Sequence, residues 1–182
     1  MPMDTELHKC VKNGDTAIAL DIINDGADVN ALGAQGRTAL HRALGGGYFE
    51  CAKMLLDNGA DPNIADAMKR TSLHWAVLGT GGEECAGLLF EVGAGNAMLN
   101  TPSKSGSTPL HCAITSGRAE LARLLLDQGA DPELKDETGK SAVELAKANG
   151  MKDLFSGRGS VKAKGRGFFS RRGSTHKKEV TL

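Results

Sequence analysis

The sequence has few aromatic residues and no cysteine pattern of a metal site. Phe, Trp and Tyr make up only 4% of the 182 residues, with one tryptophan and one tyrosine. The core therefore has to be built from aliphatic and alanine side chains, which favours closely packed helices. The four cysteines, Cys10, Cys51, Cys85 and Cys112, form no CxxC pair and have no zinc-like Cys/His spacing. We expect them to be buried, reduced thiols.

The sequence also lacks the motifs of common enzyme and membrane classes. It has no GxxxxGK[ST] phosphate loop, no GxGxxG after a strand, no GxSxG and no HExxH. The N-terminus has no signal-peptide pattern, and no apolar run approaches the roughly 18 residues of a membrane span. We therefore expect a soluble protein of the cytoplasm, with a nuclear location left open, that is not an enzyme and uses no metal or cofactor.

The formal net charge of zero results from cancellation between two parts of the chain. Residues 1–155 contain 14 Lys/Arg and 21 Asp/Glu, whereas residues 156–182 contain eight Lys/Arg and one acid. An acidic body therefore carries a basic tail. The tail is rich in glycine and charge, so it has too little apolar area to offset the entropy of ordering, and we expect it to be disordered.

A repeat of 33 residues organises the acidic body. TELH, TALH, TSLH and TPLH begin at Thr5, Thr38, Thr71 and Thr108, at intervals of 33, 33 and 37 residues. A motif of the type LLDNGADPN moves in step with them. Each unit has the apolar spacing of two short helices, and the second helix ends at a glycine. Helices this short are not stable alone, so their stability must come from stacking on neighbours.

This pattern resembles the ankyrin repeat family, whose unit is a β-turn followed by two antiparallel helices with the signature T-P-L-H-x-A. The resemblance implies an all-α solenoid over residues 1–156, with approximate units 3–32, 33–65, 66–102, 103–135 and 136–156, followed by the basic tail at 157–182. The four extra residues of the third unit fall in loops, where they either bulge harmlessly or form a protrusion for a partner.

The resemblance assigns the repeated threonines and histidines to the framework. The threonine hydroxyl satisfies a helix N-terminus, and the histidine forms hydrogen bonds locally and toward the next repeat. These signature residues are Thr5, His8, Thr38, His41, Thr71, His74, Thr108 and His111. A four-histidine metal site is disfavoured, because stacked repeats hold equivalent positions about 10 Å apart whereas metal ligands lie roughly 2 Å from one ion. A catalytic His111–Cys112 pair is disfavoured because adjacent helical side chains point apart.

The resemblance further implies that a protein partner binds the concave surface made of turn tips and first helices. The partner-binding residues implied in this way are Gln35, Arg37, Arg42, Met68, Arg70, Trp75, Lys104, Ser107, Thr115 and Lys140. Their positive bias predicts an acidic partner segment, and Arg and Trp are common interface anchors. Packing of Trp75 against neighbouring turns is the alternative. Lys69 stands where the family usually has glycine, so we expect a distorted turn over 66–71.

The basic tail suggests further contacts. Basic residues around Phe168 and Phe169 resemble segments that bind anionic membrane surfaces. The stretch RRGS makes Ser174 a candidate phosphorylation site, and the C-terminal Val180 and Leu182 could add a strand to a PDZ-like domain. The tail could also rest on its own acidic body. No folded nucleic-acid module accompanies it, so no specific nucleic acid is expected.

The sequence therefore favours a monomeric, non-catalytic protein-protein interaction module that binds through its concave surface. The alternative is a signalling adaptor that its phosphorylatable basic tail recruits to an anionic membrane surface or a scaffold.

Overall fold

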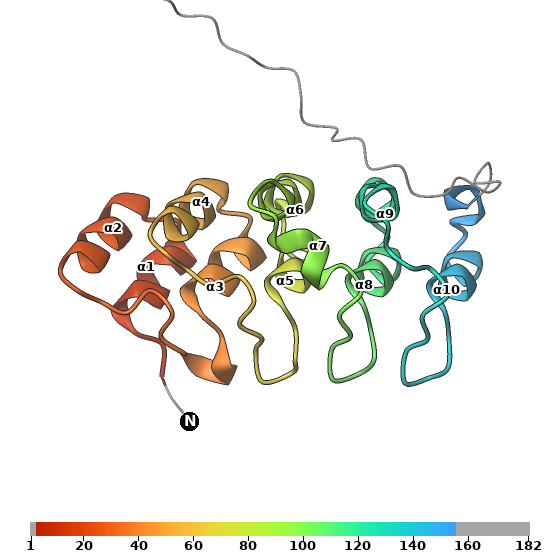
Figure 1. Ribbon diagram of the computed structural model, residues 1–182, viewed down its shortest axis with the longest axis horizontal. Helices are drawn as coiled ribbons and strands as arrows, with labels where there is room; N and C mark the ends of the chain where they lie inside the picture. Colours follow the sequence, from red (N-terminus) through yellow and green to blue (C-terminus); the bar gives the residue numbers. More distant parts are fainter. Residues whose placement is uncertain (1–2, 156–182) are drawn as a thin grey trace, which may run out of the picture.

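Helix pairs stacked in a single row make up residues 3–155, the part of the chain that the computed structural model describes (Figure 1). The elements are α1 (Glu6–Asn13), α2 (Thr16–Asn24), η1 (Ala34–Gly36), α3 (Ala39–Gly46), α4 (Phe49–Asp57), α5 (Ser72–Leu78), α6 (Gly82–Glu91), α7 (Ala94–Met98), α8 (Pro109–Thr115), α9 (Ala119–Asp127), α10 (Ala142–Ala148) and η2 (Lys152–Leu154). The predicted all-α solenoid is confirmed. The tail at 157–182, including the candidate site Ser174, lies outside the described residues.

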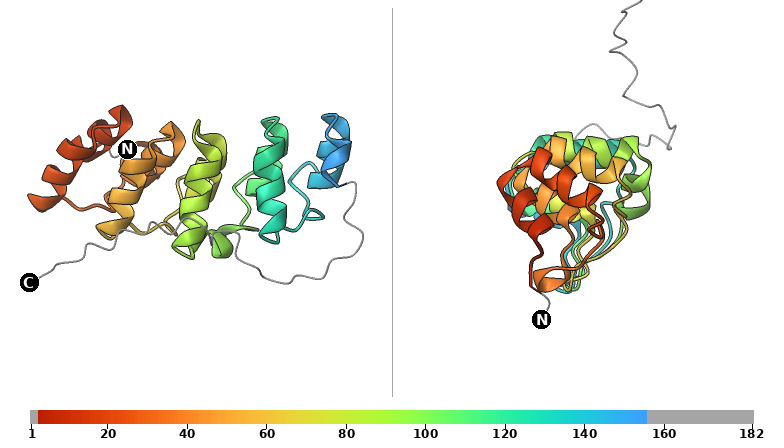
Figure 2. Two further views of the ribbon diagram at one scale, coloured as in Figure 1. Left: turned by 90° about the horizontal axis from the view of Figure 1, so that it is seen from above. Right: turned by 90° about the vertical axis from the view of Figure 1, so that its left-hand side faces the viewer.

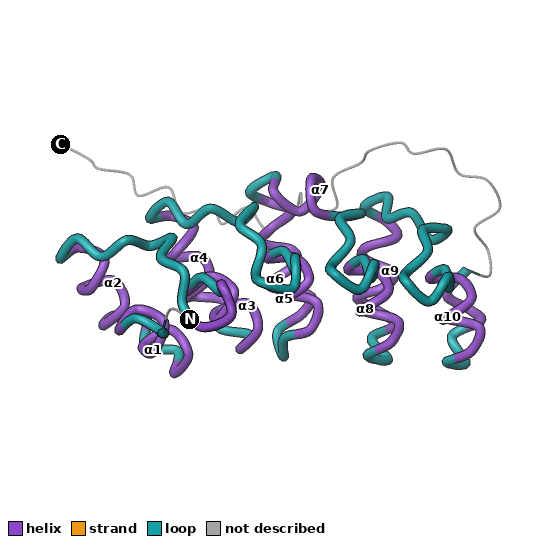
Figure 3. Tube along the Cα trace, turned by 90° about the horizontal axis from the view of Figure 1, so that it is seen from below, coloured by secondary structure: helices purple, strands orange, loops and turns teal. Residues whose placement is uncertain are grey.

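The helices form two layers along the row. The first helix of each unit (α1, α3, α5, α8 and α10) lies in one layer, and α2, α4, α6 and α9 form the other (Figures 1 and 2). The loops that connect one unit to the next project from the first layer and lie side by side along its edge (Figure 3). We call these loops the fingers, and number them 1 to 4 in chain order: residues 31–38, 64–71, 101–108 and 134–141.

The first helices begin where the sequence places a Thr or Ser before the apolar run. The backbone N–H of Thr38 donates to Nδ1 of His41 at 3.0 Å, which satisfies a group that a helix N-terminus would leave unpaired. In the last unit, Oε2 of Glu144 accepts from the backbone N–H of Ser141 at 2.8 Å. Glutamate can therefore replace histidine in the local hydrogen bond at this helix start. The second hydrogen bond of the histidines, to a carbonyl of the following unit, has no counterpart here, because no further unit follows among residues 3–155.

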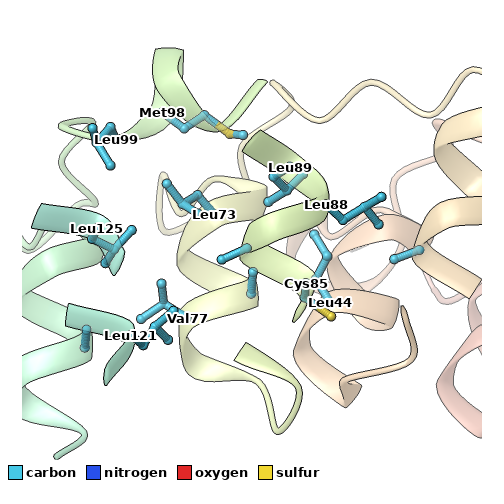
Figure 4. Close-up of a cluster of buried hydrophobic side chains, with 14 of the residues drawn as sticks. Leu44, Leu73, Val77, Cys85, Leu88, Leu89, Met98, Leu99, Leu121 and Leu125 are labelled. Carbon is cyan, nitrogen blue, oxygen red and sulfur yellow. The ribbon is translucent and has the colours of Figure 1, made fainter. Parts of the chain in front are cut away.

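The core consists of aliphatic and small side chains between the layers, as the composition predicts. Leu73, Val77, Leu121 and Leu125 meet between the third and fourth units (Figure 4), and all are buried. The four cysteines are free thiols; Cys51 and Cys85 are buried, whereas Cys10 and Cys112 are half-buried, so the prediction of full burial is wrong for two of them. Burial raises the pKa of Cys85 and of Cys112 to about 11.

Three of the four additional residues of the third unit lie within residues 93–100, which contain the short helix α7. Met98 and Leu99, at its end, are only 3% and 5% exposed, and they pack against the core (Figure 4). Gly95 lies where any Cβ would collide with the Phe90 ring, so glycine allows α7 to fold back onto α6. The insertion therefore extends the core instead of forming a loose bulge or a protrusion.

Finger 2 is regular in spite of its lysine. Lys69 has a φ of 56°, close to the 66°, 71° and 78° of Gly36, Gly106 and Gly139 at the equivalent positions. The backbone N–H of Asp66 donates to the Arg70 carbonyl at 3.0 Å, as Ser103 does to Ser107 at 2.9 Å in finger 3. The prediction of a distorted turn is wrong, because Lys69 adopts the left-handed conformation at a cost of about 1 kcal/mol.

Candidate protein-binding surface

Backbone hydrogen bonds tie the finger tips to one another. The N–H of Ala67 donates to the Gln35 carbonyl at 3.0 Å, and the N–H of Lys104 donates to the Met68 carbonyl at 2.8 Å. The N–H of Glu137 continues the series to the Ser105 carbonyl at 3.2 Å. The fingers therefore present their side chains from a connected edge and not from independent loops.

The framework histidines connect each first helix to the following finger. Nε2 of His8 donates to the Arg37 carbonyl at 2.9 Å, Nε2 of His74 to the Ser107 carbonyl at 2.9 Å, and Nε2 of His111 to the Lys140 carbonyl at 3.3 Å. In each of these three residues Nδ1 accepts a backbone N–H, so the proton lies on Nε2. The structure thus gives these histidines the geometry that the resemblance implies.

His41 differs from the other three. Its local bond to Thr38 is present, but Nε2 is buried without a hydrogen bond of standard geometry. Burial lowers the pKa of His41 to about 4, so its ring is neutral at pH 7. Burial also lowers the pKa of His74.

Trp75 is the centre of a charged cluster at fingers 1 and 2. The guanidinium carbons of Arg37 and Arg70 lie 4.4 and 4.3 Å from the centre of its ring, within the range of cation–π contacts. The indole N–H donates to Oδ2 of Asp66 at 3.2 Å. Gly45 faces the ring from α3, where a Cβ would crowd it. Trp75 is half-buried, so it both packs against the neighbouring turns and contributes to the surface.

Asp66 fixes the geometry of this cluster. Its side chain is buried and forms an ion pair with Arg70 at 2.8 Å. Its other oxygen, Oδ1, accepts the backbone N–H groups of Met68 and Arg70 at 2.8 and 2.9 Å. Burial alone would raise the pKa of Asp66, but the hydrogen bonds from Arg70 and the charge of its guanidinium lower that pKa overall. Asp66 is therefore ionised and neutralises Arg70.

Asp4 does in finger 1 what Asp66 does in finger 2: it pairs with an arginine and accepts a backbone N–H of the finger. Oδ2 of Asp4 lies 2.8 Å from the Arg42 guanidinium, and Oδ1 accepts the backbone N–H of Ala34 at 2.9 Å. Finger 1 has Gly33 where finger 2 has Asp66, and a Cβ there would collide with Asp4. An aspartate from before α1 thus replaces the missing finger side chain. Arg42 is consequently paired within the protein.

Arg37 is the cation of the cluster that no carboxylate neutralises. Its guanidinium donates to Oε1 of Gln35, its Nε is buried without a partner, and no acidic side chain within residues 3–155 forms an ion pair with it. Burial, together with the charges of Arg42 and Arg70, lowers the pKa of Arg37. An anion placed at Arg37 would relieve this repulsion.

The structure brings together part of the predicted site. Gln35, Arg37, Arg70 and Trp75 lie in one cluster, and Met68 is 47% exposed at the tip of finger 2. Arg42, also predicted, is paired with Asp4, and its charge acts on Arg37. The other four predicted residues belong to later units: Lys104, Ser107, Thr115 and Lys140. The hydroxyl of Thr115 donates to the His111 carbonyl of its own helix at 2.8 Å.

Sequence reasoning gave no site role to Asp4 or Asp66. The signal for Asp66 is the stretch DAMKRT, in which an aspartate begins the finger as Asp136 does in DETGKS. No pattern pointed to Asp4, because it precedes the first repeat motif.

Across residues 3–155, no three His, Cys, Asp or Glu side chains are grouped so that they could hold a metal ion. None of the helices in that range is long and apolar enough to cross a membrane.

Stacked helix pairs with fingers joined edge to edge define a helical-repeat solenoid of the protein-binding type. Comparison with known families is more specific: a model of "Ankyrin repeats (3 copies)" matches residues 7–100, and one of "Ankyrin repeats (many copies)" matches residues 94–146. The chain belongs to the ankyrin repeat family. Ankyrin repeats are generally non-catalytic protein-protein interaction modules.

Individual relatives are similar over part of the chain. The Caenorhabditis elegans "Ankyrin repeat and LEM domain-containing protein 1 homolog" is 35% identical over 54% of this chain and 14% of its own length. The mouse "DNA-binding protein RFXANK" is 43% identical over 29% of this chain and 20% of its own. The pig "NF-kappa-B inhibitor alpha" is 42% identical over 28% and 16%. The matched regions are thus a fifth or less of each relative.

Proposed function

We propose that this chain is a non-catalytic module that binds an acidic segment of a protein partner, with Arg37, Trp75 and Arg70 at the centre of the contact. The observation that carries the proposal is the unneutralised Arg37 guanidinium, held 4.4 Å from the centre of the only tryptophan ring of the chain. A carboxylate of the partner would complete the charge balance of the cluster.

The charges of the cluster favour an anionic ligand. Three guanidinium groups, on Arg37, Arg42 and Arg70, face two internal carboxylates, on Asp4 and Asp66. Hydrogen bonds between arginine and a carboxylate are among the stronger ones in proteins and are frequently bidentate. A carboxylate of the ligand at Arg37 would form such a hydrogen bond and would also be attracted by the guanidinium charge, which no internal carboxylate neutralises.

The surroundings of Trp75 favour an ordered contact. The ring is fixed by the bond from its N–H to Asp66 and by Gly45 beneath it. Little side-chain entropy is lost on binding when the anchor is already held. Met68, exposed at the adjoining tip, offers an adaptable apolar contact beside the charges.

Selection of peptides from a random phage-displayed library tests this proposal without knowledge of the natural partner. The full chain serves as bait, and the selected peptides are then titrated against Arg37→Ala, Trp75→Ala and the control Lys140→Ala, which removes a cation from finger 4. We expect acidic peptides whose affinity falls about 30-fold, or about 2 kcal/mol, in the first two variants and little in the control. Peptides without acidic residues, or equal losses in all three variants, would contradict the proposal.

A further inference from the structure

A groove lies on the layer opposite to the fingers, between the outer helices α4, α6 and α9. It has a volume of about 960 Å³, and its floor includes Phe49, Leu88 and Leu124. Its lining includes six carboxylate side chains and one guanidinium, that of Arg123, which forms an ion pair with Glu120. We call this feature the outer groove; it combines an apolar floor with a strongly acidic rim.

The repeat itself aligns the acidic side chains along the groove. Glu50, Glu84 and Glu120 occupy the same position in the first turns of α4, α6 and α9. Stacking places equivalent positions side by side at about 10 Å, so these three carboxylates form a row along the axis of the solenoid. Glu91, at the end of α6, also lines the groove.

One departure from the repeat opens the groove in the middle. Gly87 of α6 stands where α4 has Lys53 and α9 has Arg123. The glycine removes both the bulk of a long side chain and the cation that would offset the neighbouring acids. Glycine inside a helix lowers stability relative to alanine, so helix formation does not explain its presence.

The end of this same chain has the complementary chemistry. Residues 156–182 contain eight Lys/Arg and one acid, and Phe168 and Phe169 are flanked by Arg166 and Arg171. We infer that residues 156–182 bind intramolecularly in the outer groove, with the two phenylalanines against Leu88 and Leu124 and the basic residues along the row of Glu50, Glu84 and Glu120.

The length of the chain permits this contact. The structure describes the backbone up to Phe155, and η2, just before that residue, packs against α9, one of the helices that line the groove. Twelve residues lie between Phe155 and Phe168; the thirteen Cα–Cα steps from one to the other reach about 45 Å when the chain is extended. The helices that form the groove span only about 20 Å at the usual spacing of packed helices. A tether this short gives an effective concentration in the millimolar range, on the order of 1 mM, which favours binding within one molecule.

Photo-crosslinking in the full chain tests the inference directly. Phe169 is replaced by the photoreactive p-benzoylphenylalanine, the protein is irradiated, and cross-linked peptides are identified by mass spectrometry in the monomer fraction. We expect cross-links to the segments that contain Leu88 and Leu124. Their yield should fall as NaCl rises from about 50 to about 500 mM, because exposed charge pairs are screened by salt.

Matched variants distinguish binding in the outer groove from a general attraction between the basic tail and the acidic body. Replacing Glu84, Glu91 and Glu120 by Gln should lower the cross-link yield about tenfold, since three rim charges are lost. Replacing Glu6, Glu133 and Glu137 by Gln removes the same charge elsewhere and should leave the yield unchanged. Gly87→Lys, which restores the cation of the repeat, should also lower the yield, whereas Gly87→Ala should not. Circular dichroism establishes that each variant is folded.

Several results would overturn the inference: cross-links to the fingers or first helices, cross-links found only between two copies, no cross-links above background, or equal losses in the two triple variants. The outer groove and the Trp75 cluster lie on different layers. The failure of this experiment would therefore leave the proposed binding of an acidic partner untouched.

Discussion

His74→Ala tests whether the framework histidines join one repeat to the next. The wild-type ring is fully buried. Its Nε2 donates to the Ser107 carbonyl at 2.9 Å, and its Nδ1 accepts the backbone N–H of Thr71 at 3.2 Å. Alanine removes both bonds, so the Ser107 carbonyl and the backbone N–H of Thr71 each lose a hydrogen-bond partner. Each such loss typically costs about 1–3 kcal/mol, so we expect the free energy of unfolding to fall by about 3 kcal/mol.

His41→Ala is the matched control for this prediction. His41 occupies the same position of the preceding repeat and has the same local bond to Thr38, but its Nε2 makes no hydrogen bond of standard geometry. Its loss should therefore cost about 1 kcal/mol less than the loss of His74, which is the usual net contribution of one hydrogen bond.

Urea unfolding followed by circular dichroism at 222 nm measures both variants. With a slope of about 3 kcal/mol per molar urea, the His74 variant should unfold at a midpoint about 1 M lower than the wild type. Equal shifts for the two histidines would refute the reasoning, because the inter-repeat bond is the feature that distinguishes them. A shift near zero for His74→Ala would refute it as well.

The remaining predictions concern conformation, charge and reactivity. Lys69→Gly should raise the free energy of unfolding by about 1 kcal/mol in the same urea assay, since it removes a side chain from a left-handed position; a lower stability would contradict this. Asp66→Asn should lower it by about 3 kcal/mol, because Arg70 would lose its buried partner, and an unchanged urea midpoint would count against that role. Burial lowers the pKa of His41 from 6.5 to about 4. Stability from this group is therefore fully present above pH 6.5 and is lost as the pH falls toward 4, by roughly 3 kcal/mol in total. His41→Gln should flatten that part of the stability-pH curve, and an identical curve would show that His41 is not responsible. The thiols of Cys85 and Cys112, with pKa values of about 11, should react with iodoacetamide at pH 7.5 much more slowly than in urea; equal rates would contradict the raised pKa values.

The repeat was predictable from the sequence because its motifs are local and regularly spaced. The TxLH motifs gave the helix starts, and their period gave the stacking that connects His74 to the next finger. Arg37, Arg70 and Trp75 could be assigned to one surface for the same reason, since each lies at a fixed offset from a motif.

What the sequence did not predict depends on contacts between segments far apart in the chain. Asp4 replaces a finger side chain only because Gly33, 29 residues later in the chain, leaves room for it. The conformation of Lys69 depends on the regular fingers to either side, which override its local preference. The helix α7 forms because Met98 reaches the core, a position that the spacing of motifs does not define.

Titration of the intrinsic fluorescence of Trp75 with a selected acidic peptide is the sharpest test of whether Arg37 and Trp75 bind an acidic segment, because this is the only tryptophan of the chain. We expect a saturable change in the emission of Trp75, and a dissociation constant about 30-fold weaker in Arg37→Ala with an unchanged urea midpoint. Binding of the peptide that leaves the emission unchanged, or that is equally tight in Arg37→Ala, would contradict this expectation.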